Sequence, residues 1–163
     1  QCDRRQRQMC IRDSKYMETF VKNNREINNS VSVKTSISGV RTIYKALKDK
    51  KVICFAADQV PKRGLGEHIK LFNKMAYTTT LVQNLASKTN CPVIYICMNS
   101  NIKGFLSVSI KPCSDDIYDN SKHLQLVNKD IEKLINRRPI DYSWEYKRFK
   151  RSLPEEKNLY SGI

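Results

Sequence analysis

The chain has 163 residues, a length that suits one domain with a hydrophobic core. Its formal net charge of +14 indicates an anionic partner: nucleic acid, an anionic membrane surface or a phosphorylated substrate. The apolar runs at residues 52–57 and 92–98 fall well short of the ~20 residues that a helix needs to cross a bilayer. The sequence therefore predicts neither a membrane-spanning helix nor a signal peptide.

The ends of the chain differ from its middle. Residues 1–14 are rich in Arg and Gln, whereas the remainder prefers Lys, Asn and Ile. We therefore set residues 1–14 aside as a foreign or disordered segment, with an ordinary basic arm as the alternative. We expect residues 15–152 to form one domain or part of one, and residues 153–163 to be a loose tail.

Helix and strand patterns alternate from the start of this body. Residues 15–23 resemble the end of a helix, and residues 31–35 alternate as a short strand. A helix is predicted to begin at Gly39. Its apolar stripe has the spacing i, i+3, i+4, i+7 and consists of Val40, Ile43, Tyr44 and Leu47.

Residues 52–57 are apolar without alternation, as is typical of a strand buried on both faces of a parallel sheet. This run stops at Asp58. The loop that follows carries the turn residues Pro61, Gly64 and Gly66. A short strand is predicted at residues 69–72.

The second half of the body repeats the alternation. We predict a helix at residues 78–88, capped within the Thr78–Thr80 run, and a second buried strand at 92–98. Residues 105–110 alternate, which predicts a half-exposed strand with Leu106, Val108 and Ile110 inward. A helix follows at residues 122–136. The pattern indicates an α/β fold with an open, mostly parallel or mixed sheet flanked by helices.

Ligands of such sheets bind beyond the carboxyl ends of the strands, where Asp58 is expected to lie. Gln59 and the cations Lys62 and Arg63 follow it, so this loop is a candidate for orienting a polar substrate or holding a phosphate. A loop aspartate that only caps a turn is the alternative.

Six cysteines are present without a Cys-x-x-Cys pair, and only two histidines accompany them. Cys54 and Cys97 lie in apolar runs, where a thiol usually packs as a small buried hydrophobe. We therefore expect no metal site, no cofactor, and reduced thiols in a cytosolic compartment.

Residues 142–150 interleave four aromatic rings, including the only tryptophan, with three cations. We expect Trp144 and Phe149 to anchor the segment in the fold, and Lys147, Arg148 and Lys150 to face an anionic substrate or membrane. The alternative is a surface helix whose long cations merely keep their charges in water.

Taken together, these pieces resemble the bacterial lipid A biosynthesis acyltransferases, the Kdo-dependent lauroyl and myristoyl transferases of the lysophospholipid acyltransferase superfamily. The resemblance covers roughly residues 15–151. Its motifs, in chain order, are Gly39-Val40-Arg41, Asp58-Gln59, Lys70-Leu71-Phe72, Ala76-Tyr77-Thr78-Thr79-Thr80, Pro92-Val93 and the ending Trp144-Glu145-Tyr146-Lys147-Arg148-Phe149-Lys150. The ending is the most specific, because the family closes on Trp followed by His-Lys-Arg-Phe-Lys.

Two departures from the family pattern matter. Tyr146 stands where the family usually has His. The family's catalytic motif is His, four residues, then Asp or Glu, in which the His is the general base. Here His68 and His123 are followed at the fifth position by Asn73 and Asn128. The resemblance implies that this chain is the C-terminal part of an acyltransferase, without catalytic residues of its own and inactive alone.

The resemblance also implies a reaction and partners. The intact enzyme would move a fatty acyl chain from acyl carrier protein to a hydroxyl of a phosphorylated lipid A precursor, at the cytoplasmic face of the inner membrane and against its anionic surface. Arg25 matches a family arginine and is a candidate phosphate ligand. There are three alternatives: a lysophospholipid acyltransferase with a smaller acceptor, a basic nucleic-acid-binding domain and a structural domain. The clustering of the aromatic rings near one end disfavours the nucleic-acid-binding domain.

Overall fold

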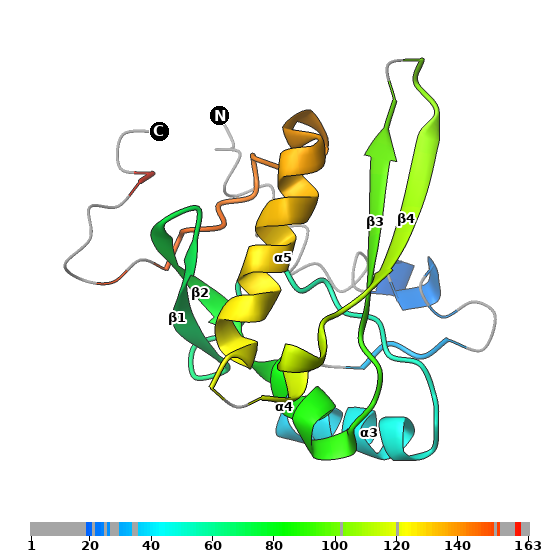
Figure 1. Cartoon of the computed structure of the whole chain (residues 1–163). Helices are drawn as coiled ribbons and strands as arrows, with labels where there is room; N and C mark the ends of the chain where they lie inside the picture. The colour runs from blue at the N-terminus through cyan, green and yellow to red at the C-terminus, as the bar shows by residue number, and fades with distance from the viewer. Residues whose placement is uncertain are drawn as a thin grey trace. The chain divides into compact units, whose positions relative to one another are not determined.

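The computed structural model describes residues 19–20, 22–24, 26, 30–33, 36–101, 103–119, 121–151, 153 and 159–160. The chain divides into two units, residues 1–46 and 47–163. The elements in chain order are α3 (Ile37–Lys48), β1 (Gly66–Leu71), β2 (Lys74–Thr79), α4 (Leu81–Thr89), β3 (Ile94–Ser100), β4 (Leu106–Pro112), the 3-10 helix η1 (Asp115–Tyr118), α5 (His123–Arg137) and the 3-10 helix η2 (Pro139–Asp141) (Figure 1).

Strands β1 and β2 form an antiparallel hairpin in which His68 is paired with Tyr77. Their turn has only two residues, Phe72 and Asn73, with φ values of 49° and 59°. Positive φ at both positions is the geometry of the tight turns that match the twist of a hairpin. The strand predicted at residues 69–72 is therefore confirmed as part of β1.

Strands β3 and β4 form a second antiparallel hairpin, with Ile96 opposite Ile110 and Met98 opposite Val108. Both strands were predicted, but their burial was not predicted correctly. The apolar side chains that were expected inside are each more than half exposed: Ile94, Ile96, Met98, Leu106, Val108 and Ile110. The sequence pattern identified which residues share a face, yet no described element of unit 2 covers that face.

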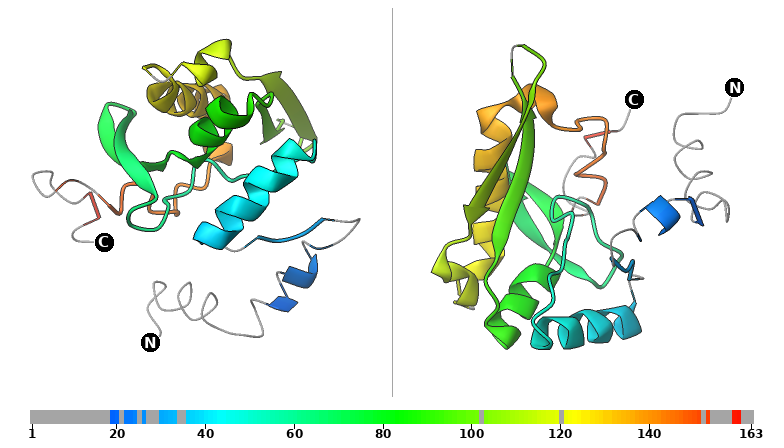
Figure 2. Two further views of the ribbon diagram at one scale, coloured as in Figure 1. Left: turned by 90° about the horizontal axis from the view of Figure 1, so that it is seen from below. Right: turned by 90° about the vertical axis from the view of Figure 1, so that its right-hand side faces the viewer.

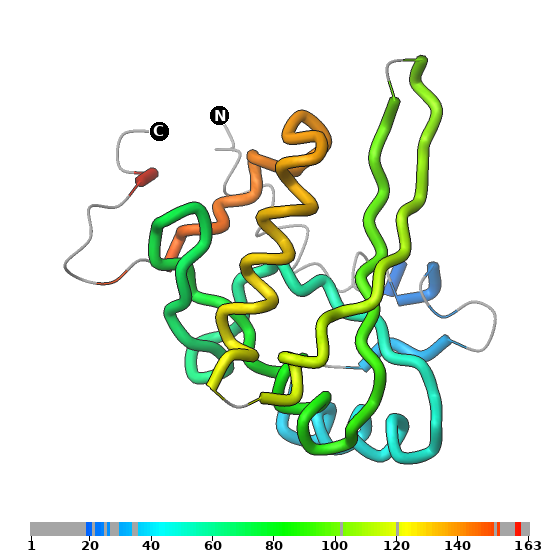
Figure 3. Tube along the Cα trace, viewed as in Figure 1, coloured from blue at the N-terminus to red at the C-terminus, as the bar shows by residue number. Residues whose placement is uncertain are grey.

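The α/β class is confirmed, but the expected open, mostly parallel or mixed sheet does not form among the described residues. These contain two separate two-stranded antiparallel sheets. Residues 52–57, predicted as a buried central strand, follow an extended path without strand pairing, and Val52 is 92% exposed (Figure 3). Hairpins between neighbouring segments need only short turns, whereas a parallel pair needs a long crossover, so the local pairings form here.

The core of unit 2 lies around α5. Its buried members are Leu71, Ala76, Ala86, Ile117, Val127, Ile131 and Ile135. The same helix satisfies polar groups of β1 and its turn: Asn128 Nδ2 donates to Lys70 O at 3.0 Å, and Glu132 Oε1 accepts from Phe72 N at 2.7 Å. Helix α5 thus lies between the two hairpins (Figures 1 and 2).

The remaining predictions concern shorter segments. Residues 31–33, which belong to the strand predicted at 31–35, form no strand. The helix predicted at 15–23 is described only in part. Cys54 is exposed rather than buried, since residues 52–57 lie outside any sheet. Among the described residues no helix is both long and apolar enough to cross a membrane. The predicted boundaries at residues 14 and 152 lie outside the described residues.

Gly66 should tolerate no side chain. A Cβ at this position would collide with the carbonyl oxygen of Thr78 on the paired strand and meet Pro61 Cγ at 2.7 Å. Because a backbone oxygen cannot move without distorting the hairpin, we expect Gly66→Ala to lower the free energy of unfolding by about 1–3 kcal/mol. Gly104→Ala is the control, since a Cβ there meets no atom within 4 Å and its cost comes only from φ +80°. Urea denaturation of both variants tests this, and equal midpoints would contradict it.

Candidate functional site

Unit 2 contains a cavity of about 1120 Å³. Three segments form its apolar walls: the extended residues 52–57, strand β3 and the inner face of α5. Those walls include Ile53, Phe55, Ala56, Ile94, Ile96, Met98, Val127, Ile131, Leu134 and Ile135. The volume and the apolar lining are those of a site for a hydrophobic ligand.

One end of the cavity is polar, because Asp58 and Tyr142 line it. Burial, followed by the negative charge of Asp58, raises the pKa of Tyr142 to about 12, so this side chain is a neutral hydroxyl at physiological pH. The Tyr142 hydroxyl is buried and has no hydrogen-bond partner among the described residues. A ligand group at the polar end could accept from this hydroxyl only after the surrounding side chains moved to expose it.

Arg148 lies next to this polar end but inside the protein, with 2% of its surface exposed. Its Nη1 donates to Tyr77 O at 2.8 Å and its Nη2 to Thr78 Oγ1 at 2.7 Å. Burial lowers the pKa of Arg148, an effect that the charge of Asp58 opposes. The expectation that Arg148 faces an anionic surface is wrong, because two of its nitrogens are used to hold strand β2.

The rest of the aromatic–basic segment holds the loop that follows Asp58. Val60 N donates to the Tyr146 hydroxyl at 2.8 Å, and the Arg151 guanidinium donates to Pro61 O. His68 Nε2 donates to Arg151 O at 3.0 Å, which joins the same segment to β1. The segment therefore fixes the position of Asp58 at the cavity.

These features coincide with the segments that carry the family resemblance. The family model described as bacterial lipid A biosynthesis acyltransferase matches residues 5–151. The chain belongs to this family. No curated protein matches it. The matched region begins within residues 1–14, the segment that the sequence analysis set aside.

Within this lipid A acyltransferase family member, the predicted site residues separate. Of the five predicted site residues that the structure describes, only Asp58 lines the cavity. Gln59 and Arg63 are exposed, and Lys147 places its Nζ 5.2 Å from the ring centre of Tyr160. Arg148 is buried and does not line the cavity. Arg25 lies outside the described residues, so the proposed pairing of Asp58 and Arg25 across one cleft stays a prediction.

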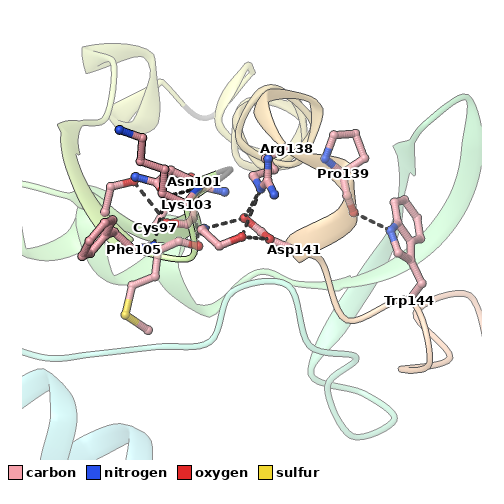
Figure 4. Close-up of polar contacts among 12 residues, drawn as sticks. Cys97, Asn101, Lys103, Phe105, Arg138, Pro139, Asp141 and Trp144 are labelled. Carbon is pink, nitrogen blue, oxygen red and sulfur yellow. Dashed lines mark hydrogen bonds and ion pairs between the residues drawn. The ribbon is translucent and has the colours of Figure 1, made fainter.

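The anchoring of the aromatic segment is confirmed for Phe149, which packs against the core. Trp144 is anchored only in part, because its side chain is 53% exposed. Its indole nitrogen donates to Pro139 O at 2.7 Å (Figure 4). Its ring meets the ring of Tyr142 edge-on, with 4.9 Å between the ring centres. These contacts hold one edge of the ring and leave the other to solvent.

Neither histidine lines the cavity. His123 is buried and its Nδ1 donates to Asp119 O at 2.8 Å, at the start of α5. His68 packs against the ring of Tyr77 with 5.0 Å between ring centres. Both histidines therefore have structural contacts, and the described cavity lining contains no histidine base.

Three sets of polar groups in unit 2 were not identified from the sequence. Four lysines line the cavity at the ends of α3 and α4 and in the segment after α3: Lys48, Lys50, Lys51 and Lys88. Asp141 accepts from Ser100 N and Ser100 Oγ, both at 2.7 Å, and from Arg138 Nε at 3.1 Å (Figure 4). These hydrogen bonds, those of Ser100 foremost, lower the pKa of Asp141. The Tyr77 hydroxyl accepts from Gly64 N and Gly66 N.

Proposed function

We propose that this chain is the acyl-binding part of a lipid A acyltransferase. The intact enzyme would transfer a fatty acyl chain from acyl carrier protein to a hydroxyl of a phosphorylated lipid A precursor, at the cytoplasmic face of the inner membrane. The observation that supports this most is the cavity, since an apolar volume of about 1120 Å³ in a member of this family suits a fatty acyl chain.

The charges around the cavity suit the two substrates of this reaction. Lys48, Lys50, Lys51 and Lys88 place four positive charges at a site whose walls are otherwise mostly apolar. Both the carrier protein's phosphate-bearing arm and the lipid A precursor are anionic, so either is attracted to this region. A lysophospholipid with a smaller acceptor would be attracted in the same way, and the described residues favour neither acceptor.

A nucleic-acid-binding role is disfavoured by how the aromatic segment is used. Base stacking needs exposed rings beside cations that can reach a phosphate backbone. Here the Tyr146 hydroxyl holds Val60 and Phe149 packs on the core. Lys150 lies 4.9 Å from the ring centre of Tyr146, so that cation already has a partner.

Filling the cavity should abolish acyl binding. Ala56 lines the cavity and is exposed to it, so Ala56→Trp adds a large ring without removing a core side chain. We expect myristate and myristoyl acyl carrier protein to bind at least about tenfold more weakly, since excluding two methylenes removes about 1.6 kcal/mol. Isothermal titration calorimetry on the whole chain measures this.

The matched control is Asn84→Trp, which is exposed on α4 and does not line the cavity. It should leave both affinities within about twofold. If the wild-type chain binds neither ligand, or if both variants bind like wild type, the cavity is not an acyl site and the proposed function loses its main support.

A further inference from the structure

The β3–β4 hairpin carries an uncovered apolar face. Alternation along the two strands places six apolar side chains on one side, each more than half exposed: Ile94, Ile96, Met98, Leu106, Val108 and Ile110. Ser107 and Ser109 lie on the opposite side of β4. A monomeric protein rarely leaves such a continuous row of apolar side chains without a partner.

The described residues at the tip of the hairpin are joined by hydrogen bonds and include an exposed aromatic ring. Asn101 Oδ1 accepts from Lys103 N at 2.9 Å and from Phe105 N at 3.0 Å, while Asn101 N donates to Phe105 O (Figure 4). Phe105 is 68% exposed, and the exposed Lys103 stands beside it. An aromatic ring next to a lysine is the combination that binds at the boundary between lipid headgroups and acyl chains.

The hairpin is attached at two described points, one at the end of β3 and one at its base. Asp141 accepts from Ser100 N and Ser100 Oγ at the end of β3, and the Tyr95 hydroxyl lies 3.3 Å from Cys113 Sγ at its base. The hairpin extends beyond the C-terminal end of α5 (Figures 1 and 2). These attachments leave Phe105 and the apolar side chains of β4, Leu106, Val108 and Ile110, each more than half exposed.

The charge of this region selects the partner. No acidic residue occurs between Glu67 and Asp115, and the charged residues of the hairpin are Lys103 and Lys111. Two copies of the hairpin placed face to face would gain no ion pair between their hairpins, because neither hairpin carries an acidic residue. An anionic lipid surface offers the apolar interior and the negative charge that this hairpin lacks.

We propose that the β3–β4 hairpin enters an anionic lipid surface with its tip and apolar face. Ile94, Ile96 and Met98 of this face also line the cavity. The face is then a path along which a lipid chain passes between the membrane and the cavity, a step that rests on the proposed function. No part of the entry into lipid requires catalysis.

Two substitutions on adjacent residues of β4 test the proposal. Val108→Asp places a carboxylate on the apolar face, and Ser107→Asp places the same charge on the opposite face. Flotation measures partitioning onto vesicles of phosphatidylcholine and phosphatidylglycerol. Both variants lose some electrostatic attraction to these vesicles, because each adds one negative charge. We expect Val108→Asp to lose at least about tenfold more partitioning, the factor for one buried valine side chain. Lys103→Gln should weaken binding several-fold on these vesicles and not on pure phosphatidylcholine.

A second readout keeps the proposal falsifiable where folding differs. Phe105→Trp in a Trp144→Phe background places a single indole at the hairpin tip, and its emission should shift to the blue and be quenched by brominated acyl chains. Equal effects of the two aspartates, or a tip indole that brominated lipid does not quench, would overturn the proposal. A third outcome would also overturn it: Val108→Asp changes the sedimentation of the chain without lipid but leaves its partitioning onto vesicles unchanged. That result would assign the apolar face to contact with a second copy of the chain. Ala56→Trp should leave vesicle binding unchanged, so failure of acyl binding and failure of lipid entry are separate results.

Discussion

Replacing Arg148 with Met should lower the free energy of unfolding by about 2–4 kcal/mol. The guanidinium supplies hydrogen bonds to Tyr77 O and Thr78 Oγ1 in the interior, and Met can make neither. A buried acceptor left without a donor costs about 1–3 kcal/mol, and Thr78 Oγ1 keeps only a longer hydrogen bond from Asn128 Nδ2 at 3.2 Å. Loss of the positive charge also leaves Asp58 without its nearby counter-charge, whereas release of a buried charge offsets part of the cost.

Lys150→Met is the matched control, because it introduces the same side chain two residues away on an exposed position. Its cation lies over the ring of Tyr146, a contact worth about 0.5–1 kcal/mol at an exposed site. Urea denaturation should therefore give a clearly lower midpoint for Arg148→Met alone. If the two midpoints agree, Arg148 does not anchor β2 and its burial needs another explanation.

The elements that sequence patterns identified well are those whose contacts are local. The stripe of Leu124, Val127, Ile131, Leu134 and Ile135 predicted a helix at 122–136, and α5 spans His123–Arg137. Alternation at 105–110 predicted β4. In both cases the periodicity of apolar residues reflects the element's own geometry, which does not depend on distant segments.

The arrangement of the sheet could not be read in this way. An apolar run such as residues 52–57 is equally compatible with a buried strand and with the wall of a cavity, since both remove one side from bulk water. Which one forms depends on whether a partner strand pairs with it, a long-range choice that composition does not encode. The run instead contributes Ile53 and Phe55 to the cavity.

The candidate site was only partly predictable for the same reason. Asp58 was identified because it ends an apolar run, and the structure places it at the polar end of the cavity. Arg148 has the same local sequence signal as Lys147 and Lys150, namely a cation among aromatic rings. Only the approach of β2, some 70 positions earlier, distinguishes the buried guanidinium of Arg148 from the half-buried Lys147 and the exposed Lys150.

The 163-residue chain should transfer no acyl group in a direct assay. General-base catalysis commonly contributes a factor of ~10²–10⁴, and the histidine-based motif that the resemblance implies for this family is absent from the sequence. Both histidines are committed elsewhere, His68 to Arg151 O and His123 to Asp119 O. The assay mixes the chain with myristoyl acyl carrier protein and a lipid A precursor and detects the acylated product by mass spectrometry.

An intact enzyme of the family serves as the positive control, and the calorimetric binding of myristoyl acyl carrier protein shows that the chain is folded and occupied. Binding without transfer is the expected combination, because the cavity and the base are separate requirements of the reaction. Product formed by the chain itself would contradict this account. Replacing His68 and His123 by Ala, one at a time, would then show whether either ring supplies the base despite its structural contact, since only a histidine that removes the hydroxyl proton would abolish product while leaving acyl binding intact.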